Sequence, residues 1–420
     1  MKQALKNILV SHQGKQYVHQ LCYALQKKGL LQGFITSIWY KPDSLLFRLA
    51  SRLPKAFYNK LVHSFKKRSF APLDLSLISQ YPYYEFFRQL AGNVLKVRGE
   101  RGVFFCERKH DKYVSQQLDK YRPDIFIGYE KSSLLSFKKA KTLGAVTVLD
   151  LAQVHYEYIR YLRDHYAPFK AIIHSEKLFD AINTVKGAEY KEADYIMALS
   201  SFAKDTLVQQ GIPQEKVYTV NLGFDPARFK LKSHYRKEGV FKILFVGTIT
   251  KRKGIQVLLE AFKSLDLPGV ELTMVGPMYD GQDVFDQYKG MFTYVPFLHH
   301  EELVKYYQDA DLFVFPSLLD SWAMTVLEAM ACGTPVIVSE NTGAKDAVKK
   351  GGGEILPIDN VPLLKEKITH FYQNRNALES LGKEAHEIAQ EYSWEQYYAR
   401  IAEVMEEIWA KKQRKVQIEA

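Results

Sequence analysis

Two carboxylates eight residues apart, Asp320 and Glu328, have the residue types and the spacing best suited to binding chemistry in this chain. They lie in a run that predicts an apolar strand (312–315), a Pro-Ser loop, a helix (about 323–331), a Gly-Thr-Pro break and a second apolar strand (336–338). At a helical rise of about 1.5 Å per residue, the acids are separated by roughly 8 to 12 Å, about the span of a sugar, a diphosphate and a ribose. The helix N-terminus between them suits the diphosphate because it offers unpaired N–H groups and a positive dipole end. One βαβ unit is therefore predicted to hold a nucleotide-sugar along its length.

The residues around this pair of acids form a longer motif. Residues 311–339 satisfy in order the pattern PS-x-x-[ED]-x-[FW]-[GA]-x-x-x-x-E-A-M-A-x-G-x-P-V-I. This run resembles the E-x7-E signature of retaining glycosyltransferases with the GT-B fold, of the family 4 (group 1) type, here as Asp320-x7-Glu328. The resemblance implies an α/β protein with two Rossmann-like, doubly wound domains that face a central cleft.

The length of 420 residues exceeds what one hydrophobic core usually supports, so two domains are expected. The resemblance assigns acceptor binding to an N-terminal domain, residues 1–230, and nucleotide-sugar binding to a C-terminal domain, residues 240–392. The polar stretch between them has the composition of an interdomain hinge. A helical pattern at about 393–420 is expected to pack back on the first domain, as the corresponding helix does in this family.

Cysteine usage and hydropathy predict a cytoplasmic protein. Cys22, Cys106 and Cys332 share no motif spacing, which favours a reducing compartment over a disulfide framework. The N-terminal apolar run is too short for a signal peptide, and no segment approaches the roughly 18 apolar residues needed to span a bilayer. Peripheral attachment to the inner face of the cell membrane is kept as a further hypothesis.

Positive charge is concentrated in the first half of the chain. Residues 1–225 hold 34 lysines and arginines against 20 aspartates and glutamates, a net charge of +14, while the remainder has a net charge of −3. The stretch 44–70 contains seven of these cations and no acid, with apolar residues at helical spacing and Pro54 placed to start a helix. Such a segment suits an anionic membrane surface. The alternative is a pair of helices that pack on their own domain with a solvated basic face.

Two places in the first domain are candidate ligand contacts. An apolar strand (6–10) leads into a turn with Gly14, where the family usually has paired glycines close to the donor diphosphate. His155 follows a second strand (146–149), at the sheet edge where ligands of open α/β sheets bind. In the resembling family a histidine at the corresponding strand end contacts the transferred sugar. Candidate acceptor contacts, at the end of the preceding strand, are Glu130 and Lys131.

The first strand of the second domain ends at a glycine-bearing loop. In the family this loop usually offers an arginine soon after the glycine and a lysine further on, both to the donor phosphates. Here Lys253 keeps the lysine and Arg252 adds a cation beside it, whereas Thr248 stands where the arginine is common. A fixed ammonium near a helix N-terminus suits a diphosphate leaving group. The loop candidates are Gly247, Thr248, Arg252 and Lys253.

Further donor contacts are predicted at two other strand ends. The turn with Pro296 and Phe297 falls where the family's nucleotide base lies. The mouth of the central helix is formed by Ala323, Met324 and Thr325. The triplet Asp309-Ala310-Asp311 spells D-x-D, a metal-binding motif in the other glycosyltransferase fold, but here it falls at a helix-to-strand turn, so no metal site is predicted.

The resemblance implies transfer of a hexosyl residue from a UDP- or GDP-sugar to an acceptor hydroxyl, with retention of configuration and without metal or cofactor. Lys253, Arg252 and the helix N-terminus would stabilise the departing diphosphate. Asp320 would hold sugar hydroxyls, Glu328 the ribose hydroxyls, and His155 the sugar from the opposite domain. The acceptor is predicted to be a saccharide or a lipid-linked saccharide used in cell-surface glycan assembly.

Two rival functions remain from the sequence. A nucleotide-sugar-binding or scaffold protein that has lost turnover is suggested by the departures from the family pattern at Gly14, Thr248, Asp320 and Ala323. A nucleic-acid-binding protein is suggested by positive charge alone, and no recognition motif supports it, so no nucleic-acid partner is predicted.

Overall fold

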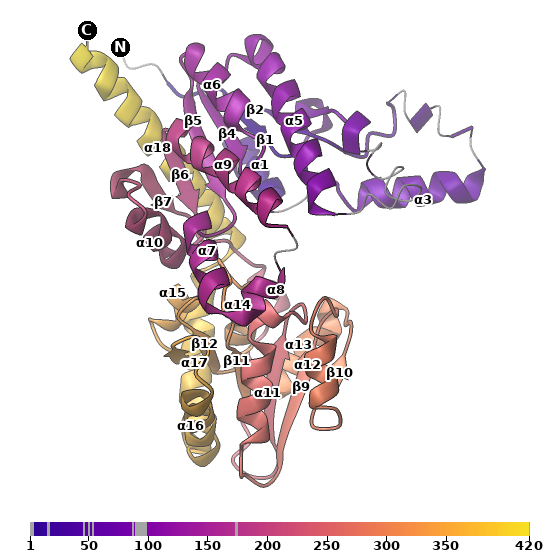
Figure 1. The fold of residues 1–420 in the computed structure, drawn as a ribbon, viewed down its shortest axis with the longest axis vertical. Helices are drawn as coiled ribbons and strands as arrows, with labels where there is room; N and C mark the ends of the chain where they lie inside the picture. Colours follow the sequence, from indigo (N-terminus) through magenta and orange to yellow (C-terminus); the bar gives the residue numbers. More distant parts are fainter. Residues whose placement is uncertain are drawn as a thin grey trace.

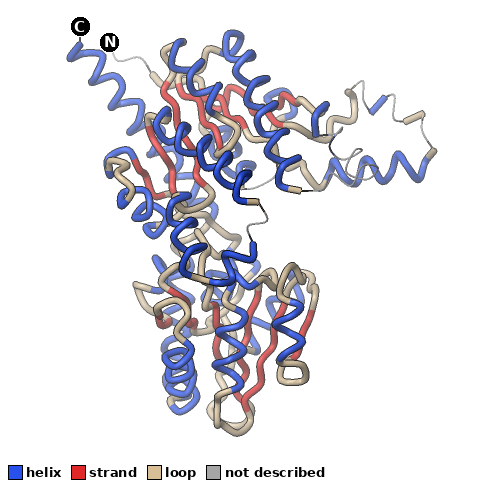
Figure 2. Tube along the Cα trace, in the orientation of Figure 1, coloured by secondary structure: helices blue, strands red, loops and turns tan. Residues whose placement is uncertain are grey.

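The computed structural model describes residues 4–14, 17–44, 47–48, 51–52, 54–85, 88, 99–172 and 175–419. The chain forms two lobes, each built on its own parallel sheet (Figures 1 and 2). In the N-terminal lobe the strand order is β3-β2-β1-β4-β5-β6-β7, and in the C-terminal lobe it is β10-β9-β8-β11-β12-β13. Each sheet is doubly wound, with helices on both faces, which confirms the predicted α/β fold.

The strands of both sheets are short apolar runs. Both faces of a doubly wound sheet are covered by helices, so its strands need apolar side chains in succession rather than in alternation. All four residues of β1 (Ile8–Ser11) and of β12 are buried. The strands of the N-terminal lobe are β1, β2 (Leu31–Thr36), β3 (Ile78–Gln80), β4 (Ile125–Tyr129), β5 (Val146–Leu151), β6 (Tyr195–Ala198) and β7 (Val217–Thr219). Those of the C-terminal lobe are β8 (Phe241–Val246), β9 (Val270–Val275), β10 (Thr293–Val295), β11 (Leu312–Phe315), β12 (Val336–Ser339) and β13 (Gly353–Leu356).

The helices follow the predicted strand-helix alternation. In the N-terminal lobe they are α1 (Val18–Lys27), α3 (Lys55–Lys66), α5 (Glu100–Tyr121), α6 (Leu134–Thr142), α7 (Tyr156–His165), α8 (Ala167–Ile172), α9 (Glu176–Glu192) and α10 (Ser201–Gln209). In the C-terminal lobe they are α11 (Ile255–Lys263), α12 (Gln282–Gln287), α13 (His300–Asp309), α14 (Met324–Ala331), α15 (Lys345–Val348), α16 (Val361–Gln373) and α17 (Leu378–Gln390). The last helix, α18 (Trp394–Glu419), leaves the C-terminal lobe and packs against α1 of the other lobe (Figure 1).

Two crossings of the chain lie side by side where the lobes are joined. The Phe224 N–H donates to the Tyr392 carbonyl at 2.9 Å, and the Trp394 N–H donates to the Phe224 carbonyl at 3.1 Å. A Cβ atom at Gly223 would lie 2.5 Å from the backbone of Ser393, so this close approach requires glycine. The two crossing segments are therefore bonded to each other through their backbones.

A second junction between the lobes lies near α7, α8 and α14 (Figure 1). The Ser321 hydroxyl donates to the Ala152 carbonyl at 2.6 Å, and the Tyr158 hydroxyl donates to Asn341 Oδ1 at 2.9 Å. The side chain of Phe169, in α8, is buried in the same hydrophobic cluster as Leu318 and Leu319. These contacts hold the carboxyl edge of one sheet close to that of the other.

The basic stretch 44–70 packs partly on its own lobe. Pro54 directly precedes α3, as predicted. The rings of Phe47 and Phe65 are buried, meet at 5.1 Å edge to face, and share a small cluster with Ile38. These contacts favour the alternative of helices packed on their own domain. Leu46, Leu49 and Leu53 lie outside the described residues, and the exposed cations of the described part include Arg48, Arg52, Lys55 and Lys66.

Within the described residues, every helix is too short or too polar to cross a bilayer.

Candidate active site

The entrance of α14 has an unusual backbone geometry. Ala323, the residue before the helix, has φ of 64°, in the left-handed region that non-glycine residues seldom adopt. Ahead of it, the Trp322 N–H donates to Asp320 Oδ1 at 3.1 Å, so the loop is tied to the first acid of the motif. Strain of this kind persists only where the surroundings enforce it, and it is typical of functional sites. The small side chain at 323, a departure from glycine in the family pattern, therefore lies at a strained position of the helix mouth.

Lys253 and Asp320 form an ion pair at this helix mouth. The two side chains are 12% and 15% exposed, so the pair is largely withdrawn from water. Burial and the nearby Arg252 lower the pKa of Lys253, while the Asp320 carboxylate in contact with it favours the charged ammonium. The sequence assigned these two residues to different parts of the donor, and the structure brings them into contact.

The loop that carries Lys253 is locked onto the strand end opposite. Residues 251–253 form one turn of 3-10 helix, and Gly254 (φ 69°) then starts α11. A Cβ atom at Gly254 would collide with the carbonyl oxygen of Pro316. The Arg252 side chain donates to the Leu319 carbonyl, and burial lowers the pKa of this guanidinium. The loop cations are therefore held over the segment between β11 and α14.

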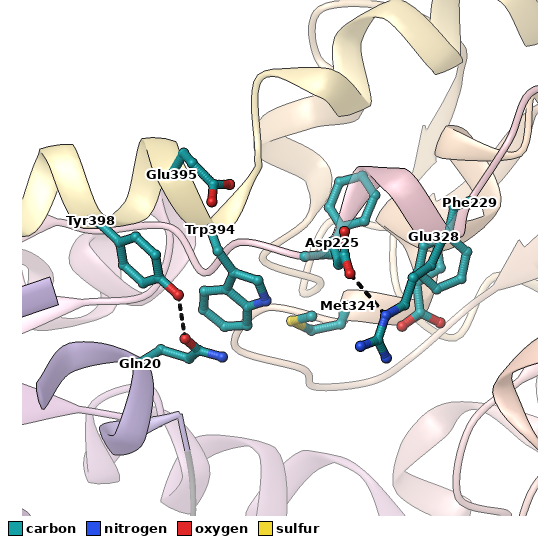
Figure 3. A pocket seen from close by; sticks show the side chains of 10 residues that line it. Gln20, Asp225, Phe229, Met324, Glu328, Trp394, Glu395 and Tyr398 are labelled. Carbon is teal, nitrogen blue, oxygen red and sulfur yellow. Dashed lines mark hydrogen bonds and ion pairs between the residues drawn. The ribbon is translucent and has the colours of Figure 1, made fainter. Parts of the chain in front are cut away.

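Glu328 lies on the buried side of α14. One of its carboxylate oxygens accepts a hydrogen bond from the Tyr307 hydroxyl at 2.8 Å. The residue is 9% exposed and lines a cavity of about 460 Å³ together with Met324 (Figure 3). Side chains from three other parts of the chain complete the wall, namely those of α1, the interlobe linker and α18. Residues 224–229, which precede the stretch between the domains, contribute Phe224, Asp225, Arg228 and Phe229. Helix α18 contributes Trp394, Glu395 and Tyr398, and α1 contributes Gln20.

The remaining donor candidates lie at the carboxyl ends of β8 and β10. The Gly247 N–H donates to the Val275 carbonyl at 2.9 Å, and the next residue, Thr248, is exposed. Pro296 is also exposed, and the Phe297 ring is 68% exposed beyond β10. An exposed aromatic ring at a sheet edge can stack on a nucleotide base. These residues share one sheet edge with the helix mouth at 323–325, since β8 lies between β9 and β11.

His155 caps a helix of the N-terminal lobe. Its Nδ1 accepts a hydrogen bond from the Glu157 N–H at 3.1 Å, at the start of α7. Burial lowers the pKa of His155 to about 4, so the ring is neutral near pH 7. The ring lies 4.5 Å from that of Tyr156 and 5.1 Å from that of Tyr190. His155 therefore has a capping role that the sequence did not predict, and its contact with the sugar stays a prediction.

A second cavity, of about 380 Å³, opens at the carboxyl edge of the N-terminal sheet. It contains Gly14 from the first turn and the two candidate acceptor contacts, Glu130 and Lys131. Asp150 was not predicted from the sequence, although it lies near the carboxyl end of β5, where ligands of open α/β sheets bind. The helix residues missed with it are Glu107 from α5 and Lys186 from α9, and no local pattern distinguishes these from ordinary helix charges.

The two aspartates of the D-x-D triplet form ion pairs with nearby cationic side chains. Asp309 pairs with Arg236 and with Lys242, the latter at 2.7 Å, and Asp311 accepts from the Lys242 N–H at 2.8 Å. No group of three or more His, Cys, Asp or Glu side chains within the described ranges is arranged to hold a metal ion.

Two doubly wound lobes that face each other across these strand ends define the GT-B class. A solved structure with this fold, sucrose-phosphate synthase from Thermosynechococcus elongatus, aligns over 97% of this chain and 100% of its own, with a TM-score of 0.66 and 18% identity. HepE of Anabaena, solved in complex with UDP-glucose, aligns over 96% of this chain and 99% of its own, with a TM-score of 0.60 and 15% identity.

The family assignment comes from the sequence of the C-terminal lobe. Residues 227–388 match the model of the glycosyl transferases group 1 family. Over these residues the chain is similar to the group 1 glycosyl transferases. The amylovoran biosynthesis glycosyltransferase AmsK of Erwinia amylovora is 26% identical over 239 residues. That match covers 52% of this chain and 58% of AmsK, so it spans little more than half of the relative's length.

Proposed function

We propose that this protein is a retaining hexosyltransferase that moves a sugar from a nucleotide-diphospho-sugar to an acceptor hydroxyl in polysaccharide or lipid-linked saccharide assembly. We also propose residues 1–230 and 240–392 as its two domains. The observation that carries the proposal is the arrangement at α14, where a buried lysine, a helix N-terminus and the second acid of the motif line one sheet edge. HepE, which shares the fold, was solved in complex with UDP-glucose, and a UDP-sugar is accordingly our first candidate donor.

The chemical difficulty of the reaction is charge separation, because the sugar becomes oxocarbenium-like as the diphosphate departs. Lys253 and the N–H groups at 324–325 would stabilise the growing negative charge, and their fixed positions avoid reorganisation during the reaction. Arg252 would add a second positive charge beside Lys253. Its side chain is held in place by its hydrogen bond to the Leu319 carbonyl. Asp320 would hold Lys253 in place and accept hydrogen bonds from sugar hydroxyls.

Glu328 would anchor the nucleotide through its ribose. A carboxylate accepts charge-assisted hydrogen bonds from two neighbouring hydroxyls. The Tyr307 hydroxyl orients this carboxylate, and the exposed ring of Phe297 would stack on the base. The departing phosphate would itself accept the proton of the acceptor hydroxyl, as in the front-face mechanism considered for retaining enzymes of this fold. His155, neutral near pH 7, would contact the sugar from the other lobe.

The first test of the proposal is a thermal-shift screen of UDP, GDP, CMP and their sugars, followed by turnover of the best donor with and without EDTA. A specific ligand raises the melting temperature by mass action. We expect one nucleotide to stabilise the protein and its sugar to be consumed equally in both buffers. Loss of turnover in EDTA with recovery on adding magnesium or manganese would contradict the metal-free mechanism. Binding without turnover would instead favour a donor-binding protein that has lost catalysis.

We further propose that the exposed cations near α3 hold the protein against an anionic membrane surface, from which a lipid-linked acceptor is reached. Each basic residue near such a surface contributes about 1 kcal/mol. The test compares flotation of wild type with anionic liposomes to that of a variant in which Arg48, Arg52 and Lys55 are changed to Glu. A charge-matched control changes Lys112, Lys120 and Lys138, which are exposed elsewhere on the same lobe. Equal loss of flotation in both variants would mean that net charge, and not this segment, decides attachment.

A further inference from the structure

The segment that follows β12 joins the C-terminal lobe to a helix of the N-terminal lobe. We call residues 340–346 the interlobe loop, and its last residue, Asp346, lies in α15, next to α10 of the other lobe (Figure 1). The Asp346 carboxylate accepts two hydrogen bonds from Ser201, one from its N–H at 2.7 Å and one from its hydroxyl. Ser201 is the first residue of α10, where backbone N–H groups lack partners within the helix and the helix dipole is positive. A carboxylate of one lobe thus satisfies the N-terminus of a helix in the other.

Two further residues of the interlobe loop fit closely against the N-terminal lobe. A Cβ atom at Gly343 would lie 2.8 Å from the hydroxyl oxygen of Ser200, so this approach requires glycine. Asn341 is 3% exposed, and its Oδ1 accepts the hydrogen bond from Tyr158 in α7. Its Nδ2 atom donates to a carbonyl of its own lobe, at Leu318, at 3.0 Å. The loop therefore meets α7 and α10 through buried, hydrogen-bonded groups.

The other side of the interlobe loop is bonded to the backbone of Asp320, the first acid of the motif. The Asp320 N–H donates to the Asn341 carbonyl at 2.9 Å, and the Gly343 N–H donates to the Asp320 carbonyl at 2.8 Å. Asp320 and Thr342 accordingly form a short parallel bridge. The Asp320 side chain continues the chain of contacts to Lys253. A displacement of α10 relative to the C-terminal lobe is thus transmitted to the acid at the helix mouth.

Every partner in this set of contacts belongs to the chain itself. Hydrogen bonds to a charged group are about twice as strong as those between neutral groups, so the two bonds of Asp346 are the strongest of the set. Asp346 lies beyond the run 311–339 that carries the family motif, and none of the roles assigned above involves it.

We propose that Asp346 is a positioning residue that keeps the two lobes in contact at α10 and, through the interlobe loop, holds Asp320 in place for the transferred sugar. The effect on Asp320 rests on the proposed glycosyl transfer, whereas the contact between the lobes does not. Nucleotide binding depends on Lys253, Glu328 and the start of α14, all within the C-terminal lobe, so it should survive the loss of Asp346.

The experiment measures the distance between the lobes by pulsed electron paramagnetic resonance on the full chain. Nitroxide labels are attached at Lys138→Cys and Lys289→Cys, two exposed positions in different lobes, and the three native cysteines are buried, which protects them from the label. Asp346→Ala removes both hydrogen bonds, and Ser201→Ala removes only the bond from the hydroxyl. The charge-matched control is Asp205→Ala, exposed on the same helix α10. Circular dichroism verifies that each variant is folded.

We expect one distance in the wild type and the control, and an added population of longer distances in Asp346→Ala. Loss of the charge-assisted bonds should lower the ratio of joined to separated lobes by about tenfold or more, with Ser201→Ala in between. Identical distance distributions in the wild type and both variants would overturn the inference. If Asp346→Ala does not fold, Ser201→Ala alone decides.

Kinetics and calorimetry on the same variants test the effect on Asp320. In Asp346→Ala we expect kcat to fall about tenfold or more, because a small displacement of a positioning group is costly, while affinity for UDP stays within about threefold. Longer distances with unchanged kcat would overturn the positioning role. A wild type that turns over no donor sinks the proposed function, and the distance distributions then still decide whether Asp346 joins the lobes.

Discussion

The carboxyl edges of the two sheets have the same architecture and opposite electrostatics. In the C-terminal lobe Lys253 faces a helix N-terminus, and its one carboxylate partner belongs to the binding motif itself. In the N-terminal lobe the cations of the second cavity are each matched by a carboxylate from another element, as in the Lys186–Glu130 pair. The first edge can therefore stabilise a bound anion, whereas the lysines of the second edge are already paired with carboxylates.

The charge of each carboxyl edge differs in sense from the net charge of the half of the chain that contains it. The half with a net charge of +14 contains the internally neutralised pocket, and the half with −3 contains the cationic edge. The excess cations of the first half lie at the surface, among them Arg48, Arg52 and Lys55 near α3. Net charge thus describes the outer field of a lobe, whereas the chemistry of its pocket depends on which few groups the fold brings together.

The largest effect is expected when the cation of the C-terminal edge is removed. Lys253→Ala should lower turnover by roughly 100-fold or more, since the variant loses one preorganised charge contact with the departing diphosphate. Steady-state kinetics with the donor found in the screen measures this. The matched control is Lys251→Ala in the same short turn, because Lys251 pairs with the exposed Asp283 at 2.5 Å. Similar losses of turnover in the two variants would mean that activity depends on the net charge of the turn and not on the position of Lys253.

The next largest effect is expected at the second acid of the motif. Glu328→Gln should weaken nucleotide binding by about tenfold or more, because the amide loses the charge-assisted contacts with ribose hydroxyls. Calorimetric titration with the nucleoside diphosphate measures the affinity. Tyr307→Phe serves as the control, since it removes one hydrogen bond to the carboxylate without removing the charge of Glu328. Unchanged affinity in a folded Glu328→Gln variant would contradict the assignment of α14.

His155, in the N-terminal lobe, combines a helix-capping hydrogen bond with a lowered pKa. Its folded-state pKa is about 4, while an unfolded histidine titrates near 6.5. Between these values the unfolded chain binds a proton that the folded chain does not, so the free energy of unfolding falls as pH falls through this window. The slope from this residue is at most about 1.4 kcal/mol per pH unit.

His155→Asn should remove that contribution to the slope and keep the helix cap, since asparagine supplies the acceptor that the Glu157 N–H needs. Denaturant unfolding of both proteins at pH 4.5, 5.5 and 7.0 measures the difference. Parallel stability curves would show that His155 does not carry this pH dependence.

The smallest effect is expected at the strained helix mouth. Ala323→Gly should raise the free energy of unfolding by up to about 1 kcal/mol, because glycine adopts positive φ without a Cβ clash. Ala329→Gly, inside the same helix, should lower it by about 1 kcal/mol or more, because this substitution also removes a buried methyl group. Urea denaturation measures both. A loss of stability in Ala323→Gly would mean that the backbone here is not strained.

Much of the fold was predictable because it depends on local pattern. The run at 311–339 was predicted as strand, helix and strand, and it forms β11, α14 and β12 within a residue or two of the expected limits. The GT-B fold followed from the same run and is confirmed, and residues 227–388 match the group 1 family that the run resembles. The roles of the individual site residues stay predictions. For the basic stretch 44–70, the spacing of apolar residues does not decide between a membrane and the protein's own core as the partner of the apolar face. Phe47 and Phe65 lie on that face and are buried in the protein.

By itself, the sequence determined the apolar strands, the helix starts and the spacing of Asp320 and Glu328, because each depends on residues a few positions apart. Only the tertiary structure decided which charges are partners. Lys253 meets Asp320 across 67 positions, and Lys131 meets Glu107 because β4 and α5 converge at one sheet edge. Periodicity specifies which face of an element is apolar, but the order of strands in the sheet decides which loops adjoin. The charge of each pocket is therefore a property of that order, and it leaves a cation at one edge and pairs the lysines of the other with carboxylates.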